Sequence, residues 1–360
     1  MTSNKEGSSH APVGKPSPVV EPGEFVFAAT HLDHGHIYGQ CNGLTEAGGT
    51  LRYVCDDNPD RVAAFLKAFP EAKPVERFED ILDDPEVRLV AAAAVPNARG
   101  PLGVRVMQSG KDYFTDKTPF TSLDQLQTAR EVATQTGKKY AVYYSERLHV
   151  ESAIFAGQLI QEGAIGKVVE VVGFGPHRIG DPQSRPAWFY EKEKYGGILC
   201  DIGSHQFEQF LFFTGATDAT VLSATVANRA HPDYPELEDF GEAHLLANNG
   251  ATNFIRVDWL TPLGSRVWGD GRTFILGTKG YIELRKYVQL GNDEGGDQLY
   301  LVNDEGEQHL SLKGKVGFPY FGQLILDSLN RTENAMTQVH AFKAAELCLL
   351  AQTQAQRIAG

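Results

Sequence analysis

Short apolar runs alternate with helical patterns over the first 146 residues of the chain. Apolar runs at residues 24–29, 51–56, 87–96, 111–117 and 139–146 predict strands, and the near-continuous run at 87–96 is typical of a strand buried on both faces. Apolar positions with helical spacing predict helices at residues 58–70 and 121–137. This alternation predicts a parallel sheet with crossover helices, so we expect a doubly wound α/β domain over residues 24–146.

Both of these helices carry recognisable end signals. Asn58 can cap the first helix, and Pro59 suits its first turn. Ser122 and Gln125 have the spacing of a helix start, and Gly137 is a typical stop. The end signals therefore support the two helices independently of the apolar pattern.

The pattern changes after residue 146. Helices are predicted at 150–163, at 203–215 and over a long amphipathic stretch at 333–358, whose buried stripe we expect to contain Val339, Phe342, Ala345 and Leu349. Strand-like runs flank polar turns at residues 248–250, 278–280 and 304–306, which are hairpin signals. We therefore expect a second α/β domain over residues 147–360 with a mainly antiparallel sheet, whose last helix packs back on the first domain.

Composition narrows the class of protein. The chain has 360 residues, enough for two domains, and a net charge of −13, which repels nucleic acids and anionic membranes. Its four cysteines are scattered, which favours a reducing cytoplasm over a disulfide framework. No apolar run reaches the roughly 20 residues of a membrane span. Residues 1–23 are rich in Pro, Ser and Gly and lack a secretory pattern, so we expect a flexible arm there.

The stretch FAATHLDHGHIYGQ at residues 27–40 follows the first strand, where a dinucleotide-binding fold places its glycine-rich phosphate loop. The glycine fingerprint is absent. Asp56 nevertheless ends the second strand at the spacing expected of the acid that binds the adenosine ribose, unless it only caps the next helix. A carboxylate there repels a 2′-phosphate, so the sequence favours NAD over NADP.

The same stretch contains four potential metal ligands, His31, Asp33, His34 and His36. Ligands this close together on a tight turn rarely converge, and no distant ligand cluster completes them in the sequence, so we expect no metal. The preferred interpretation is a loop that binds pyrophosphate through backbone N–H groups around Gly35, the following helix N-terminus and the histidine side chains.

Two further segments carry candidate chemistry. Lys117 follows the fourth strand, at the sheet edge where ligands bind. In YGGILCDIGSH, Asp201 and His205 fall one helical turn apart after two glycines. A carboxylate beside an imidazole suits alcohol oxidation, because the imidazole takes the hydroxyl proton while the carboxylate orients it. The alternative is a helix cap beside a semi-buried histidine.

Taken together and in order, five segments resemble the glucose-fructose oxidoreductase/inositol dehydrogenase (Gfo/Idh/MocA) family. They are DDNPDRVAAF, DKTP, the GGxLxDxGxH-like segment at 196–205, EDFGEAHLLANNGAT and LGTKGYIEL. The resemblance implies an N-terminal Rossmann domain, a C-terminal domain with an open sheet that often forms the oligomer interface, and a polar cluster of Lys117, Asp201 and His205 around nicotinamide and substrate. It also implies a nicotinamide-side role for Pro96 and Asn97.

The chain departs from the family pattern in three places. The fingerprint glycines are mostly missing, and DKTP has one more residue between lysine and proline than the usual EKP. After Pro96 and Asn97 the usual histidine is absent, and Arg99 can fill its place.

The loop before the Asp201 helix carries aromatic and hydrogen-bonding groups that suit a sugar or polyol, or alternatively a subunit contact. The candidate substrate residues are His177, Arg178, Arg185, Trp188 and Tyr190. We therefore expect an NAD-dependent homo-oligomeric (dimeric or tetrameric) dehydrogenase that acts on a secondary hydroxyl of a sugar, glycoside, inositol or related polyol. The alternatives are a sugar-processing lyase or glycosidase that retains its NAD, and a non-catalytic cofactor-binding protein.

Overall fold

The computed structural model describes residues 17–291 and 295–359, which form two compact units. The first unit comprises the described residues up to Tyr143 together with Gly317–Phe342, and the second comprises Tyr144–Val316 and the residues from Lys343 onward. The boundary expected between residues 146 and 147 stays a prediction, as does the arm, of which residues 1–16 lie outside the described part. Within the first unit, Val19 N–H donates to the carbonyl of Ala47 at 2.9 Å.

The first unit contains a six-stranded parallel sheet. Its strands are β1 (Val26–Thr30), β2 (Thr50–Cys55), β3 (Lys73–Pro74), β4 (Val87–Ala92), β5 (Asp112–Asp116) and β6 (Tyr140–Tyr143), in the order β3-β2-β1-β4-β5-β6. The prediction of a doubly wound parallel sheet is confirmed. The strand order reverses between β1 and β4, and the carboxyl ends of the strands at this point are where such sheets bind ligands.

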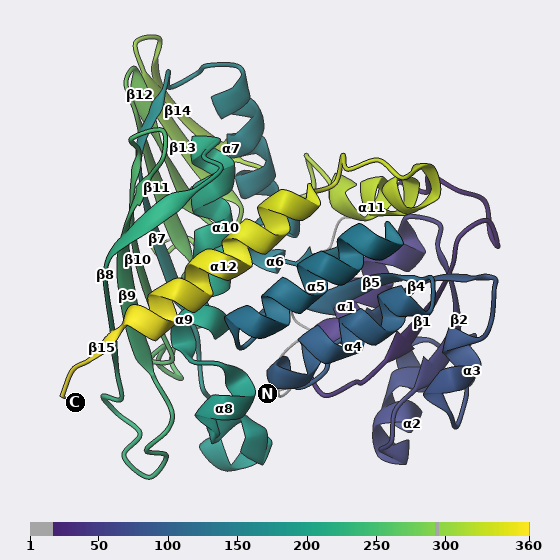
Figure 1. Ribbon diagram of the computed structural model, residues 1–360. Helices are drawn as coiled ribbons and strands as arrows, with labels where there is room; N and C mark the ends of the chain where they lie inside the picture. The colour runs from purple at the N-terminus through teal and green to yellow at the C-terminus, as the bar shows by residue number, and fades with distance from the viewer. Residues whose placement is uncertain (1–16, 292–294, 360) are drawn as a thin grey trace. The chain divides into compact units, whose positions relative to one another are not determined.

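The helices of the first unit lie between its strands along the chain, apart from one in the segment 317–342. They are α1 (His36–Glu46), α2 (Pro59–Ala68), α3 (Phe78–Leu82), α4 (Pro96–Gln108), α5 (Leu123–Thr136) and α11 (Pro319–Asn330). Asn58 accepts from the amides at the start of α2, Ser122 accepts from Gln125 N–H, and Gly137 has a φ of 64° at the end of α5. The predicted end signals of both helices are therefore confirmed. In space, α4 packs against α5, and α1 packs against α11 (Figure 1).

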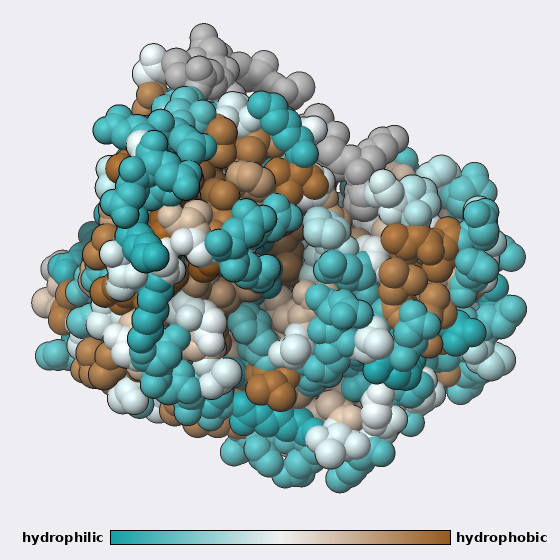
Figure 2. Space-filling view, turned by 90° about the horizontal axis from the view of Figure 1, so that it is seen from above, coloured by the Kyte–Doolittle hydropathy of each residue, from teal (hydrophilic) through white to brown (hydrophobic). Residues whose placement is uncertain are grey.

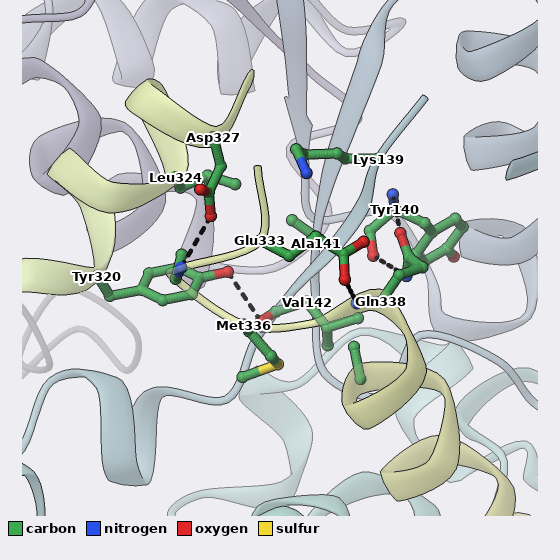
Figure 3. A pocket seen from close by; sticks show the side chains of 12 residues that line it. Lys139, Tyr140, Ala141, Val142, Tyr320, Leu324, Asp327, Glu333, Met336 and Gln338 are labelled. Carbon is green, nitrogen blue, oxygen red and sulfur yellow. Dashed lines mark hydrogen bonds between the residues drawn. The ribbon is translucent and has the colours of Figure 1, made fainter. Parts of the chain in front are cut away.

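The segment 317–342 is tied to the edge strand β6, although the sequence analysis assigned it to the second domain. The side-chain amide of Gln338 accepts from Tyr140 N–H at 2.7 Å and donates to the carbonyl of Tyr140 at 2.9 Å (Figure 3). The hydroxyl of Tyr320 donates to the carbonyl of Val142 at 3.4 Å. These side chains satisfy backbone groups of β6, which is an edge strand of its sheet.

The second unit contains a nine-stranded sheet. Its strands are β7 (Val168–Pro176), β8 (Ala219–Ala227), β9 (Phe240–Ala247), β10 (Thr252–Asp258), β11 (Arg272–Gly277), β12 (Gly280–Arg285), β13 (Gln298–Asn303), β14 (Gly306–Ser311) and β15 (Gln356–Arg357), in the order β14-β13-β12-β11-β7-β10-β9-β8-β15. Every neighbouring pair is antiparallel except β7 with β10 and β8 with β15. The predicted mainly antiparallel sheet and its three hairpins are confirmed.

The helices of the second unit lie on one face of this sheet. They are α6 (Ser145–Leu148), α7 (Glu151–Gln161), α8 (Lys192–Tyr195), α9 (Ile198–Asp201) and α10 (Gly203–Thr214), with short 3₁₀ turns η2 (Pro182–Ser184) and η3 (Ala187–Tyr190). Figure 1 shows α7, α9 and α10 against the same side of the strands, where α10 packs on β7 and α9 on β9. Alternate strand residues such as Val171, Ile255 and Ile282 point into the core between the two layers and are buried.

The last helix, α12 (Gln338–Gln354), is shorter than the stretch 333–358 that the sequence predicted. Thr337 accepts from His340 N–H at 3.1 Å and fixes the start, while Gln356 and Arg357 leave the helix to pair with β8. The predicted stripe is correct for Phe342, Ala345 and Leu349 but wrong for Val339, which is 71% exposed.

The surface mixes polar and apolar residues. Figure 2 shows hydrophilic residues over much of one face, with hydrophobic residues in patches between them. Scattered apolar residues of this kind are ordinary on protein surfaces. Among the described residues, no helix combines the length and the apolar character that a membrane crossing requires.

Candidate functional site

A histidine–aspartate pair lies at the carboxyl edge of the parallel sheet. His36 begins α1 after β1, and Asp116 ends β5, two places along the sheet. His36 Nδ1 donates to Asp116 Oδ1 at 2.7 Å, and His34 Nδ1 lies 3.4 Å from Oδ2 of the same carboxylate. The side chain of Asp116 is fully buried. Sequence reasoning missed Asp116, although its place directly before Lys117 at a strand end was an available signal.

Arg99 completes this cluster from the first turns of α4. Its Nη2 donates to Asp116 Oδ2 at 3.2 Å, and its Nε donates to the carbonyl of Ala94 at 2.7 Å. Its Nη1 donates to the carbonyls of Lys117 and Thr118, the latter at 3.1 Å. Arg99 is 1% exposed, so this planar five-donor group is used to hold the chain around Lys117.

The backbone of Lys117 is consequently bound on both sides. Its N–H donates to Asp116 Oδ1 at 2.8 Å, and its carbonyl accepts from Arg99. The residue itself is 4% exposed. The Arg99 side chain thus binds the carbonyl of Thr118, the residue that lengthens DKTP relative to EKP. That Arg99 takes the place of the family histidine stays a prediction.

The charges in this cluster shift the protonation of its members. Burial alone would raise the pKa of Asp116, but His36 and Arg99 hold it well below its usual range, so the carboxylate is ionised. Desolvation, together with His36 and the cations Lys117 and Arg99, lowers the pKa of His34 well below its usual value despite the attraction of Asp116. His34 is therefore a neutral hydrogen-bonding group near pH 7.

The histidines of the first loop do not form one group. The ring of His31 lies 2.9 Å from the hydroxyl of Thr30 and packs edge-on against Phe78, whereas His34 and His36 turn toward Asp116. Asp33 binds Arg61 at 2.5 Å instead. The loop thus separates its polar side chains into three different environments.

One reason for expecting no metal is wrong, because a distant residue does join the histidines. Ligand atoms of His34, His36 and Asp116 all lie within 4.8 Å of one another. The carboxylate, however, already accepts from His36, Arg99 and the Lys117 amide, and the positive charges of Arg99 and Lys117 act on the neighbouring ring of His34. This charge balance favours a hydrogen-bonded network, and the absence of a metal stays our prediction.

Asp56 lies at the end of β2 with its carboxylate bound to the loops around it. Oδ2 accepts from Leu32 N–H at 2.6 Å and Oδ1 accepts from Asn58 N–H at 2.8 Å. The carboxylate therefore shapes the first loop and also caps the turn before α2. Each oxygen keeps a second lone pair, so these contacts are compatible with a ribose hydroxyl as a further donor.

Two other candidates for the cofactor lie at the start of α4. Pro96 is its first residue and is buried, and the carbonyl of Asn97 accepts from the side chain of Gln125 at 2.9 Å.

Gly35 is the N-cap of α1, whose first turn contains no acidic residue. The N-terminus of α1 thus carries a favourable field for an anion.

In the second unit, Asp201 ends α9 and His205 lies in the first turn of α10. Ile202 between them has helical φ and ψ angles, so the two helices are nearly continuous and the four-residue spacing is kept on one side. Asp201 is 9% exposed and His205 is 1% exposed, with its ring edge-on to Tyr144 at 6.4 Å.

The double glycine before α9 has a structural reason. Gly196 and Gly197 have φ angles of 88° and 90°, and a Cβ on Gly197 would lie 2.3 Å from the side chain of Gln352. That side chain accepts from Leu199 N–H at 2.9 Å, and Glu238 accepts from Ile198 N–H at 3.0 Å. The start of the helix that carries Asp201 is therefore fixed by two hydrogen bonds that the sequence did not indicate.

Three of the predicted substrate residues bind backbone carbonyls of the second unit. Arg178 donates to two carbonyls, including that of Val267 at 2.6 Å, and Arg185 donates to the carbonyl of Ile179 at 2.7 Å. Tyr190 donates to the carbonyl of Pro182 at 2.7 Å. Trp188 packs only loosely, 6.0 Å from Phe189 between ring centres. Substrate roles for these residues stay predictions.

His177 differs from these residues, because it lies in an aromatic cluster at the end of β7. Its ring centre is 4.3 Å from that of Trp268 and 5.3 Å from that of Trp259. His177 Nδ1 donates to the carbonyl of Gly175 at 3.2 Å, which fixes the ring. An imidazole held against two indoles is a suitable wall for a polyol.

A pocket lies in the second unit at the loop after β10. Its volume is about 760 Å³, and charged residues that line it are Arg256, Asp258, Arg266 and Asp270. None of the site residues predicted from the sequence lines it. The candidate site therefore rests on the side-chain clusters and not on this pocket.

Two family descriptions match the chain. The one described as "Oxidoreductase family, NAD-binding Rossmann fold" matches residues 29–144, and "GFO/IDH/MocA C-terminal domain" matches residues 155–283. These matched ranges contain Asp56, Lys117, Asp201 and His205.

Similar proteins include both solved structures and characterised enzymes. A crystal structure titled as a putative oxidoreductase from Erwinia carotovora atroseptica SCRI1043 is 49% identical, with a TM-score of 0.90 over 93% of this chain and 100% of the other. In Bacillus subtilis, scyllo-inositol 2-dehydrogenase (NAD⁺) is 25% identical over 56% of either chain, and an NADP⁺-dependent scyllo-inositol 2-dehydrogenase is 25% identical over 53% of either chain. The matched part thus spans about half the length of these two enzymes.

Proposed function

The chain belongs to the Gfo/Idh/MocA oxidoreductase family and contains an NAD(P)-binding Rossmann domain, and from this premise we propose that it is an NAD-dependent dehydrogenase. The substrate we propose is a sugar, glycoside, inositol or related polyol, oxidised at a secondary hydroxyl. Distant homologues are inositol and sugar dehydrogenases, which supports this substrate class.

The observation that carries the proposal is the support built around Lys117. Lys117 follows the internal strand β5 at its carboxyl end, and its backbone is bound by Asp116 and Arg99, so its side chain extends from a fixed main-chain position. A cation at that position stabilises the oxygen of a carbinol as its proton leaves.

His205 acts in this proposal as the general base that removes the hydroxyl proton, and Asp201 orients it. The neighbouring positions on a nearly continuous helix and the low exposure of both residues support these roles. The bound nicotinamide supplies the hydride acceptor. The roles of Lys117, Asp201 and His205 are the part of the proposal carried over from the family resemblance.

For the cofactor, we propose that the amides at the start of α1 bind the pyrophosphate of NAD, with neutral His34 as a side-chain donor. The first turn of α1 has no acidic residue, which supports an anion at this end. His34 Nδ1 accepts from His36 N–H at 3.2 Å, so the neutral ring donates from Nε2. We propose Asp56 as the acceptor for the hydroxyls of the adenosine ribose. We propose separately that Pro96 and Asn97 contact the cofactor on the nicotinamide side.

The test is NADH formation by the purified protein with NAD⁺ and a panel of D-xylose, D-glucose, levoglucosan and inositols. We expect one or more of them to give stoichiometric NADH, and Lys117→Ala and His205→Asn to lower kcat by about 100-fold or more. Full turnover in Lys117→Ala would overturn the assigned role. Sugar turnover without net NADH would instead favour the alternative in which NAD is retained, and a failure to bind NAD would favour a non-catalytic protein.

A further inference from the structure

A buried carboxylate lies in the second unit that neither the family nor the sequence pattern assigns. Glu146 is in the first turn of α6 and is 2% exposed. Its Oε2 accepts from the side-chain amide of Gln206 at 2.8 Å and from Lys286 Nζ at 3.3 Å. Because both partners are donors, this oxygen is fixed in place.

The support behind Oε2 is built from three different elements. Lys286 follows β12 and also donates to Gln209 Oε1 at 2.7 Å, so α10 holds both the lysine and the carboxylate. Strand β7 leaves room for this support: a Cβ on Gly173 would lie 2.4 Å from Gln206 Oε1, and one on Gly175 would lie 3.0 Å from Nε2. The glycines of the segment GFG therefore allow Gln206 to reach Glu146.

The second oxygen, Oε1, is buried, and among the described residues no donor lies within hydrogen-bond distance of it. A buried acceptor without a donor costs about 1–3 kcal/mol, so such an atom calls for a ligand or an ordered water. The neighbouring buried carboxylate, Glu208, differs in this respect, because both of its oxygens accept from Arg147. Of these two buried glutamates, only Glu146 has a carboxylate oxygen without a hydrogen-bond donor.

Oε1 faces the aromatic cluster of the second unit. It lies 4.0 Å from Nε2 of His177, whose ring packs on Trp268, and Trp268 in turn packs on Tyr287 at 4.6 Å. A hydrogen-bond acceptor beside aromatic rings is the combination that binds a polyol, because hydroxyl groups need acceptors while the C–H face of the ring needs apolar surface.

We propose that Oε1 of Glu146 accepts a hydrogen bond from a substrate hydroxyl other than the one oxidised, and thereby selects uncharged polyols over sugar phosphates and sugar acids. The inference rests on the proposed function. An ionised carboxylate is only an acceptor, so the group that meets it must be a donor, whereas a phosphate or carboxylate of a substrate would be repelled. Lys286, which contacts Oε2, balances the negative charge of Glu146.

The test compares wild type with Glu146→Gln on the best substrate of the panel and on its monodeoxy derivatives. Gln206 and Lys286 require an oxygen, so the new amide places its NH₂ group toward the substrate and exchanges an acceptor for a donor. We expect kcat/KM to fall by about 10- to 100-fold, the range for losing a hydrogen bond to a charged group, with the NAD dissociation constant unchanged. We also expect that removing one particular substrate hydroxyl lowers kcat/KM by a similar factor in wild type but changes it little in Glu146→Gln.

Glu208→Gln is the matched control, because Glu208 is another buried carboxylate of the second unit and lies on α10. We expect it to lower thermal stability without changing the ranking of the deoxy derivatives. Wild type that oxidises every deoxy derivative equally well, or that prefers a sugar phosphate or sugar acid, would overturn the inference, even where Glu146→Gln does not fold. If polyols are oxidised but Glu146→Gln matches wild type, the inference fails and the proposed function stands; if no polyol yields NADH, both fail.

Discussion

The guanidinium of Arg99 and the carboxylate of Asp116 form a buried ion pair, with 3.2 Å between Nη2 and Oδ2 and side-chain exposures of 1% and 0%. Such a pair is sensitive to loss of one partner, because the other charge is then left buried without compensation. Here the pair also fixes the peptide groups on both sides of Lys117. The local chain therefore depends on a residue that does not itself need to touch substrate.

Arg99→Lys is expected to reduce kcat on the true substrate by about 100-fold, because an ammonium group cannot bind the Ala94, Asp116, Lys117 and Thr118 acceptors together and Lys117 shifts. Steady-state kinetics measure this effect. The smaller Arg99→Ala variant is expected to regain part of its rate in guanidinium salts, because the added cation can bind the acceptors that Arg99 leaves. Arg105→Lys, at an exposed pair with Glu79, is the control and should leave kcat unchanged.

Asp56→Asn is expected to weaken NAD binding by about 10-fold and to narrow the preference for NAD over NADP, since the charge that repels a 2′-phosphate is lost while the contact to Leu32 N–H can be kept. Calorimetric titration with both cofactors measures the two constants. Asp57→Asn, at an exposed neighbour, is the control. An unchanged NAD/NADP ratio in Asp56→Asn would contradict the ribose role.

Removal of divalent metals is expected to leave activity and NAD binding unchanged. The Asp116 carboxylate is compensated by Arg99 and bound by His36, so the cluster needs no cation to be stable. Dialysis against EDTA followed by elemental analysis and assay tests this. Activity that is lost with the metal and restored by Zn²⁺ would show that His34, His36 and Asp116 are ligands instead.

Asp297 is expected to make stability depend on pH. Burial, with a contribution from Glu151, raises its pKa from 3.8 to about 6, while its Oδ1 accepts from Ser152 N–H at the start of α7. An acid whose pKa is raised on folding stabilises the protein at low pH, and this contribution of about 3 kcal/mol is lost as the pH rises through 6. The melting temperature of wild type, relative to that of Asp297→Asn, should therefore decrease as the pH rises from 4 to 7. A constant difference would contradict the assignment.

Gly103→Ala is expected to destabilise the first unit by about 1–3 kcal/mol or more. A Cβ at this position in α4 would lie 2.3 Å from Tyr140 and 2.6 Å from Tyr113, both buried. The clash outweighs the gain in helix propensity of about 1 kcal/mol. Thermal unfolding measures the loss, and Gly264→Ala, which meets no atom within 4 Å, is the control. Equal stability of the two variants would show that α4 can shift.

The sequence by itself determined the two architectures and several helix ends. Strand periodicity and hairpin turns depend on neighbours in the chain, so the parallel sheet, the antiparallel sheet and the caps at Asn58 and Ser122 could be read locally. Lys117, Asp201 and His205 could be proposed as site residues because each follows a local signal, a strand end or a helix start after two glycines.

Only the tertiary structure decided which side chains meet within each unit. Asp116 is 80 residues from His36, and Glu146 is 140 residues from Lys286, so no local pattern could pair them. The same holds for Gln338, whose side chain binds β6, and for Val339, which a helical stripe predicted to be buried. Contacts of this kind are set by how sheets and helices pack, and the chemistry of both candidate clusters depends on them.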